Sequence, residues 1–215
     1  MHRQISIRQR VLLFSVITGI LLILWAYTSI PISSLRMIRL SEYSSLISIL
    51  FLYLSLIISP LYTFWPELPW KPYLVKARRA IGVSGWAFGL FHSFIGFFGQ
   101  LSGIHGLVFL SSQYKSALIL GLSALFLFTL LAITSTKQAI QFFQYPRWKL
   151  LHRSTYIASF AVVVHALMLG THFRNVSDFI PSLFLFLLFV LLCMEAYRFI
   201  VWRTNTPIRS SVILS

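Results

Sequence analysis

Three histidines on one apolar, helix-length stretch are the first residues of this sequence that could do chemistry. The stretch is Arg147–Phe173, and it carries His152, His165 and His172. An unsatisfied polar group costs several kcal/mol in hydrocarbon, so an imidazole buried there needs a partner or a ligand. Imidazole nitrogens are also the commonest metal ligands in proteins. These residue types therefore indicate a metal or cofactor site within a membrane.

A further histidine, His92, lies on a second apolar stretch that is rich in glycine. At about 100° per residue, His92 shares one helix face with five glycines, namely Gly85, Gly89, Gly96, Gly99 and Gly103. Close helix packing with a hydrogen-bonded imidazole explains such a face. A flat macrocycle ligated by histidine also needs missing side chains around its ligand. The combination favours haem, with cofactor contacts at Gly89 and Gly96.

His92 and His165 are expected to lie at a similar depth. At a rise of 1.5 Å per residue, His92 is about 18 Å beyond Ala80 and His165 is about 22 Å beyond Leu150. Two imidazoles on neighbouring helices at one level can ligate a single iron from both faces. We therefore expect these two residues to form a haem site.

His152 has two interpretations. On a straight helix it would be about 220° around from His165, and it is flanked by Arg147, Lys149 and Arg153. The spacing favours an interfacial histidine among cations whose stems lie along the apolar surface. The alternative is a second haem or a quinone site near the cytoplasmic edge.

The composition predicts the elements that position these residues. Hydrophobic residues make up 58% of the chain, charged residues make up 10%, and the mean hydropathy is +0.83, which is typical of an integral membrane protein. Six apolar runs are long enough to cross about 30 Å of hydrocarbon. They predict an all-α, six-helix transmembrane bundle forming one domain, residues 1–215, with helices over Val11–Ile30, Ser44–Phe64, Ala80–Gly99, Ala117–Thr134, Leu150–Phe173 and Phe179–Trp202.

The cations predict the orientation of this bundle. Most of the 18 Lys and Arg residues lie in the N-terminal tail, in the loops after the second and fourth runs, and in the C-terminal tail. The positive-inside rule then places both termini in the cytoplasm. Topology and anionic lipid explain the net charge of +14 better than nucleic acid does. We expect the lipid bilayer as a partner and no nucleic acid.

Several short motifs, taken together, resemble the ferric reductase-like transmembrane family. They are Arg78-Arg79-x-x-Gly82 ahead of His92, Thr134-Ser135-Thr136, Trp148-x-x-x-His152, and His165. The similarity is strongest to a bacterial inner-membrane branch, the haem-binding subunits that serve periplasmic methionine sulfoxide reductases. The family core would cover about residues 44–173.

The resemblance implies haem b held by His92 and His165, with His152 a ligand or near-ligand of a second haem. It implies quinone or a flavin reductase as the electron donor, with FMN or quinone as further cofactors. The acceptor would be a periplasmic or extracellular redox protein, such as a molybdenum-containing methionine sulfoxide reductase. Arg78, Arg79 and Arg153 could pair with haem propionates or quinone carbonyls, although positive-inside anchoring explains them equally well.

One departure from the family and two alternative functions stay open. Two-haem members carry a second histidine on the third helix, where this chain has Arg78 and Arg79. No Gly-rich phosphate-binding motif follows a strand, so a nucleotide-binding domain is not expected and another molecule must deliver electrons. The alternatives are a standalone ferric reductase-type cytochrome and a haem-free helical membrane protein. We expect His105 and His172 to be ordinary surface histidines, and Glu195 to pair with Arg198.

Overall fold

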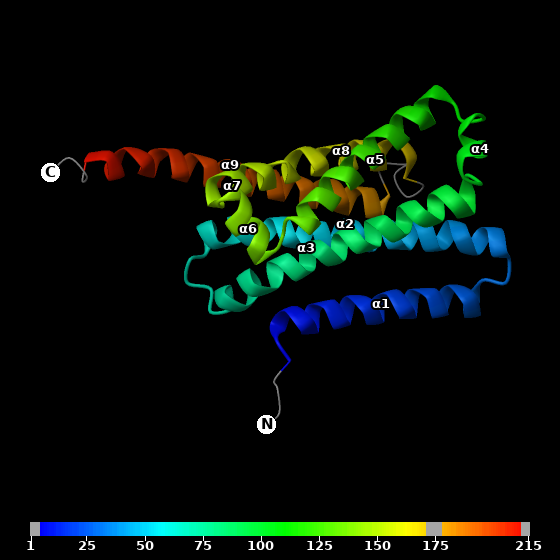
Figure 1. Ribbon diagram of the computed structural model, residues 1–215, viewed down its shortest axis with the longest axis horizontal. Helices are drawn as coiled ribbons and strands as arrows, with labels where there is room; N and C mark the ends of the chain where they lie inside the picture. The colour runs from blue at the N-terminus through cyan, green and yellow to red at the C-terminus, as the bar shows by residue number, and fades with distance from the viewer. Residues whose placement is uncertain (1–4, 171–177, 212–215) are drawn as a thin grey trace.

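The predicted all-α architecture is confirmed. The computed structural model describes residues 5–170 and 178–211, with side chains to Val201, and these ranges contain helices and no strands (Figure 1). The helices are α1 (Ile7–Ser29), α2 (Ser33–Phe64), α3 (Lys71–Phe94), the π-helix η1 (Ile95–Gln100), α4 (Ile104–Leu107), α5 (Ser112–Ile133), α6 (Lys137–Phe143), α7 (Tyr145–Arg153), α8 (Thr155–Leu169) and α9 (Phe179–Ser211).

The six predicted spans are confirmed, with different limits. Six helical segments of the described residues are long and apolar enough to cross a membrane. Helix α2 begins at Ser33 rather than Ser44, because the charged residues ahead of the apolar run have local partners; Arg36, for example, donates to the Ile30 carbonyl oxygen (2.8 Å). Arg39 and Glu42 form an ion pair of 2.8 Å one turn apart, so this polar stretch continues the helix.

The fifth predicted span, Leu150–Phe173, is not one straight helix as expected, because two helices meet within it. Helix α7 ends at Arg153 and α8 begins at Thr155, with Ser154 between them. The Ser154 hydroxyl donates to the Leu151 carbonyl oxygen (2.8 Å), a local bond that competes with the helical pattern and bends it. His152 therefore lies in the last turn of α7, and the angle of about 220° to His165 does not apply. The predicted end of this span, Phe173, lies outside the described residues.

The most extensive helix contact is a close seam between α2 and α3. Three serines of α2 spaced seven residues apart, Ser41, Ser48 and Ser55, face glycines of α3 and of η1, which continues it. The Ser48 hydroxyl donates to the Gly85 carbonyl oxygen (2.7 Å). Missing side chains on one helix and short hydroxyl side chains on the other allow the backbones to approach, as is common between membrane helices.

This seam gives a stability prediction for Gly85. A Cβ atom at residue 85 would lie 3.0 Å from Leu52 Cγ and 3.1 Å from the Leu52 backbone nitrogen. We expect Gly85→Val to destabilise the protein by about 1–3 kcal/mol, because the two backbones must separate. The measurement is the apparent melting temperature of the detergent-solubilised protein. Gly19→Val is the control, since its nearest neighbours are 3.8 Å away; equal melting temperatures for the two variants would contradict the seam.

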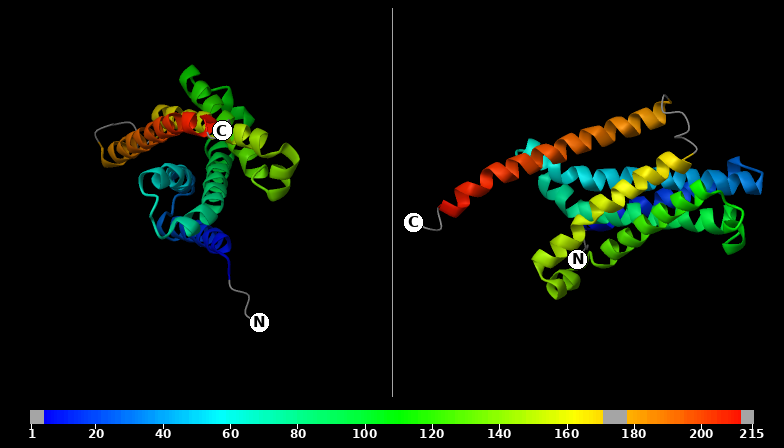
Figure 2. Two further views of the ribbon diagram at one scale, coloured as in Figure 1. Left: turned by 90° about the vertical axis from the view of Figure 1, so that its left-hand side faces the viewer. Right: turned by 90° about the horizontal axis from the view of Figure 1, so that it is seen from above.

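Helix α3 joins two groups of helices. It packs against α1 and α2 on one side and contacts α5 on the other, as the end-on view shows (Figure 2, left). Helix α5 in turn packs extensively on α8. The indole nitrogen of Trp86 donates to the Thr129 hydroxyl (2.9 Å), next to an apolar cluster that includes Phe128, Leu131 and Ala158. The C-terminal part of α9 extends beyond the other helices (Figures 1 and 2).

Candidate functional site

The predicted meeting of His92 and His165 occurs in the structure. His92 lies in the last turn of α3, and His165 lies on α8. Their ring centroids are 6.3 Å apart, and the ring planes are inclined at 76°. Two imidazoles that ligate one iron from opposite faces have centroids about 6 Å apart, because each metal–nitrogen bond is about 2 Å long. The observed separation is close to that geometry.

The Nδ1 atom of each ring lies at hydrogen-bond distance from a backbone carbonyl oxygen. His165 Nδ1 lies 2.8 Å from the Ala117 carbonyl oxygen of α5. His92 Nδ1 lies 3.0 Å from both the carbonyl oxygen and the hydroxyl of Ser41 on α2. Among the described residues, Nε2 of neither ring has a hydrogen-bond partner. Histidines that bind metals almost always donate their other N–H to such an acceptor, which fixes the tautomer and the ring orientation.

Gly121 of α5 is a site residue that sequence reasoning missed. A Cβ atom there would lie 2.8 Å from Nδ1 and 2.9 Å from Cε1 of His165. The imidazole therefore lies flat against the α5 backbone. Gly121 is also one turn after Ala117, so its missing side chain leaves the Ala117 carbonyl accessible to the ring. In the sequence, the feature that could have indicated Gly121 is that it is the single glycine within the apolar span Ser112–Ile133.

A π-helical segment directly follows His92. Helix η1 begins at Ile95, and its wide turn includes the bond from the Leu101 amide to the Gly96 carbonyl oxygen (3.0 Å). Such segments are rare and occur frequently at functional sites. Here the wide turn lies next to the candidate ligand on α3.

The glycine face of α3 and η1 is covered by α2. A Cβ atom at Gly89 would lie 3.1 Å from the Ser48 hydroxyl, and one at Gly96 would lie 3.9 Å from the Ser41 hydroxyl. The shared face of His92 and these glycines is thus as expected from helical spacing. The predicted cofactor contacts of Gly89 and Gly96 stay a prediction, since both residues face serines of α2.

His152 lies in a separate polar environment, in the last turn of α7. Its Nε2 is 3.3 Å from the Thr134 hydroxyl, and its ring centroid is 4.0 Å from that of Trp148. The Trp148 indole donates to the Thr134 carbonyl oxygen (2.9 Å). The three motif residues therefore contact one another. Whether His152 binds a second haem stays a prediction.

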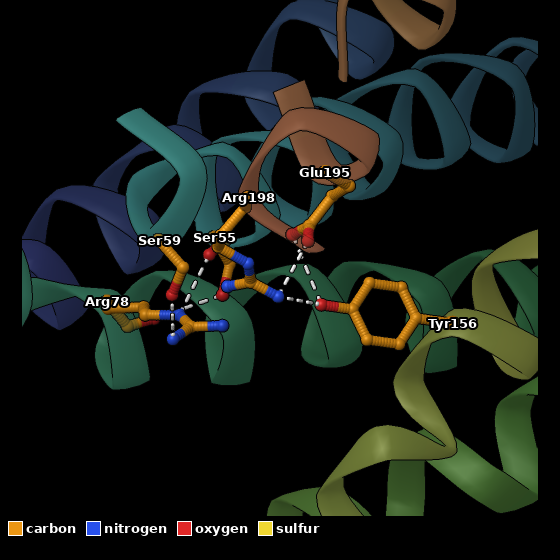
Figure 3. A network of polar contacts seen from close by, with 6 residues as sticks. All are labelled: Ser55, Ser59, Arg78, Tyr156, Glu195 and Arg198. Atoms are coloured by element: carbon orange, nitrogen blue, oxygen red, sulfur yellow. Dashed lines mark hydrogen bonds and ion pairs between the residues drawn. The ribbon is translucent and has the colours of Figure 1, made fainter. Parts of the chain in front are cut away.

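The predicted arginines lie in different surroundings. Arg78 reaches from α3 to α2, where its Nε donates to the Ser55 carbonyl oxygen (3.0 Å) and its Nη1 to the Ser59 hydroxyl (2.5 Å). Figure 3 shows this contact beside Tyr156, Glu195 and Arg198. Arg79 is half-buried and Arg153 is exposed. Their predicted pairing with propionates or quinone carbonyls stays a prediction.

The remaining predictions concern the Glu195–Arg198 ion pair and the histidines His105 and His172. The ion pair between Glu195 and Arg198 is confirmed, at 2.6 Å. His105 is exposed on α4, and His172 lies outside the described residues. Within residues 5–170 and 178–201, no three His, Cys, Asp or Glu side chains gather as a metal site. The histidine pair is therefore the strongest candidate site in the part of the chain that the structure describes.

The fold and the histidine pair define a multi-pass helical membrane protein with paired imidazoles between two spans. The family model described as "Ferric reductase like transmembrane component" matches residues 43–164. The chain belongs to this family. Its match covers α3, α5 and α7, which carry His92, Gly121 and His152. It also covers most of α8 but ends one residue before His165.

Two curated relatives are similar to this chain. The protein-methionine-sulfoxide reductase heme-binding subunit MsrQ of Salmonella arizonae is 28% identical over 194 residues, which cover 87% of this chain and 92% of that protein. The magnetosome protein MamZ of Magnetospirillum gryphiswaldense is 32% identical over 139 residues, or 64% of this chain. The chain spans only 20% of the length of MamZ. The predicted resemblance to the family and to its MsrQ branch is confirmed.

Proposed function

We propose that this protein is a haem b-binding membrane subunit that transfers electrons across the membrane. The single observation that carries the proposal is the imidazole pair, with ring centroids 6.3 Å apart and both Nδ1 atoms next to backbone carbonyl oxygens. Family membership and the similarity to a heme-binding subunit support it.

His92 and His165 would hold the haem through their Nε2 atoms. A bound haem supplies an iron that accepts and releases one electron at a time. The Ser41 and Ala117 carbonyls would keep both rings in the Nδ1–H tautomer, so that Nε2 carries the lone pair. Burial between α3, α5 and α8 would exclude water from the ligands, and both factors tune a haem potential. One haem accounts for this pair; a second one would need His152.

The charge distribution supports an orientation of the bundle in the membrane. The cation-rich ends of α3, α7 and α9 lie toward one end of the bundle (Figure 1), and the positive-inside rule assigns that end to the cytoplasm. Both termini would then be cytoplasmic, in the inner membrane of a bacterium. Electrons would enter from quinol or from a flavin reductase, and leave to a periplasmic redox protein. The name of the MsrQ relative favours a methionine sulfoxide reductase as that acceptor, and we propose a molybdenum-containing one.

A reduced-minus-oxidised absorbance spectrum of the purified, detergent-solubilised chain tests the proposal. We expect a b-type spectrum with a low-spin iron, because His92 and His165 would both ligate the iron through imidazole nitrogens. Extraction and quantification of the haem gives the number per chain. A value near one agrees with a single site at His92 and His165, and a value near two would assign a second haem to His152. A colourless protein after expression with sufficient haem would refute the proposed function.

A further inference from the structure

Helices α6 and α7 form a short hairpin at one edge of the bundle. Helix α5 has 22 residues, so at 1.5 Å per residue it is about 33 Å long, enough to cross about 30 Å of hydrocarbon. Thr134 directly follows α5 and forms hydrogen bonds with His152 and Trp148 of α7. The hairpin therefore lies at the level where α5 leaves the hydrocarbon.

The hairpin also projects to the side of the bundle. It lies beside the ends of α5 and α8 in Figure 1. The view along the bundle shows it extending sideways, away from α2 and α9 (Figure 2, left). A segment that projects sideways at the edge of the hydrocarbon has lipid head groups as its neighbours.

Large apolar side chains are exposed on both helices of the hairpin. Phe142 is 82% exposed, Leu150 is 67% exposed and Tyr145 is 59% exposed. The rings of Phe142 and Phe143 have centroids 5.1 Å apart, and Tyr145 stacks on Trp148 with centroids 6.0 Å apart. Aromatic side chains in such positions are typical of the boundary between hydrocarbon and water.

The same hairpin carries exposed cations without acidic partners. They are Lys137, Arg147, Lys149 and Arg153. None of them forms an ion pair among the described residues, and the sequence has no Asp or Glu between Glu67 and Asp178. Lys149 Nζ lies 5.9 Å from the centroid of the Tyr145 ring, so a cation and an exposed aromatic ring share one face. This face is complementary to an anionic surface with hydrocarbon beneath it.

Other anionic partners fit this surface less well. A soluble phosphate would neutralise the cations and leave Phe142 and Leu150 exposed to water. An acidic protein would approach from the aqueous side, whereas the hairpin projects into the layer that surrounds the bundle (Figure 2, left). Anionic phospholipid supplies both a phosphate and hydrocarbon at this level.

We propose that the α6–α7 hairpin binds anionic phospholipid, with Arg147 and Lys149 at the phosphate groups and with Phe142 and Leu150 at the upper part of the acyl chains. The site is independent of haem. Trp148 and His152 lie on the half-buried face of α7, so a lipid on the exposed face would hold the helix that positions them.

A fluorophore on the hairpin tests this site in the full-length chain. It is attached to Gln141→Cys, an exposed position of α6, after Cys193→Ser removes the free cysteine. The protein is placed in phosphatidylcholine nanodiscs with spin-labelled phosphatidylglycerol or with spin-labelled phosphatidylcholine of the same acyl chains. A cation near an anionic membrane surface favours binding about fivefold. We therefore expect the hairpin to prefer phosphatidylglycerol at least about tenfold, as measured by quenching.

Charge variants in this labelled background test the role of the cations. Lys149→Gln should lower the preference for phosphatidylglycerol about fivefold. Lys115→Gln makes the same change at an exposed position in the first turn of α5, at the opposite end of that helix from the hairpin, and should keep the wild-type preference. Equal preferences in these two variants would overturn the proposal.

The aromatic residues should give a different signature. Phe142→Ser is expected to reduce quenching by both lipids and to leave their ratio unchanged, because it removes an apolar contact and no charge. Phe109→Ser, at an 88% exposed position just before α5, should have no effect. A change in the ratio with Phe142→Ser, or equal quenching in the two serine variants, would contradict the proposed placement of the rings.

Two further outcomes would assign another occupant and overturn the proposal. Equal quenching by the two lipids in the wild type would leave the hairpin to an acidic protein. Loss of the phosphatidylglycerol signal on addition of inorganic phosphate would indicate a site for free phosphate.

Discussion

His92→Ala and His165→Ala are each expected to lower the haem content of the purified protein at least about tenfold. Each substitution removes one of two imidazoles whose centroids are 6.3 Å apart, so only one of the two histidines would remain to hold the iron. The measurement is the haem extracted per chain, together with the low-spin absorbance of the reduced protein.

His105→Ala is the matched control for these variants, because His105 is exposed on α4. It should retain the wild-type haem content. Wild-type spectra in both His92→Ala and His165→Ala would show that the pair does not ligate the iron. Loss of haem in His152→Ala alone would instead place the haem site at His152 on α7.

Gly121→Val is expected to remove most of the haem without altering either histidine. A Cβ atom at residue 121 would lie 2.8 Å from His165 Nδ1, a distance that real Cβ contacts do not tolerate. The ring must rotate, which breaks its hydrogen bond to the Ala117 carbonyl oxygen (2.8 Å) and turns Nε2 away from His92. Loss of such a supporting contact typically lowers metal affinity about 10- to 100-fold.

The smaller substitution Gly121→Ala gives a more diagnostic result. We expect a partly loaded protein whose reduction potential and low-spin spectrum differ from the wild type, because the orientation of His165 has changed. A purely structural role of Gly121 would lower the yield and leave the spectrum of the folded fraction unchanged. Leu122→Val, on the exposed face of the same helix, controls for the effect of valine on α5.

The spans and the histidine pair could be predicted from local properties of the sequence. Apolar length fixes a membrane helix almost independently of its neighbours, and the rise per residue gave the common level of His92 and His165. The contact between the two rings is confirmed, while their role as haem ligands stays a prediction. The serine repeat of Ser41, Ser48 and Ser55 is a further pattern in the sequence, and it marks the face of α2 that lies against α3 and η1.

Features that depend on tertiary contacts could not be predicted in this way. The break at Ser154 follows from a side-chain bond that competes with the helix, and the same residue type continues the helix at Ser159. The wide turn of η1 has no sequence signature of its own. The function of Gly121 becomes visible only when His165 is packed against it.

The division of the helices has a consequence for how the protein is assembled. The seam of Ser48 and Gly85 joins α2 firmly to α3, and α5 is joined to α8, but the two pairs share fewer contacts with each other. His92 belongs to the first pair and His165 to the second. A ligand bound by both imidazoles would link the pair of α2 and α3 to the pair of α5 and α8. Cofactor loading and completion of the fold would then be a single event, and newly inserted chains without it would be the ones exposed to membrane proteases.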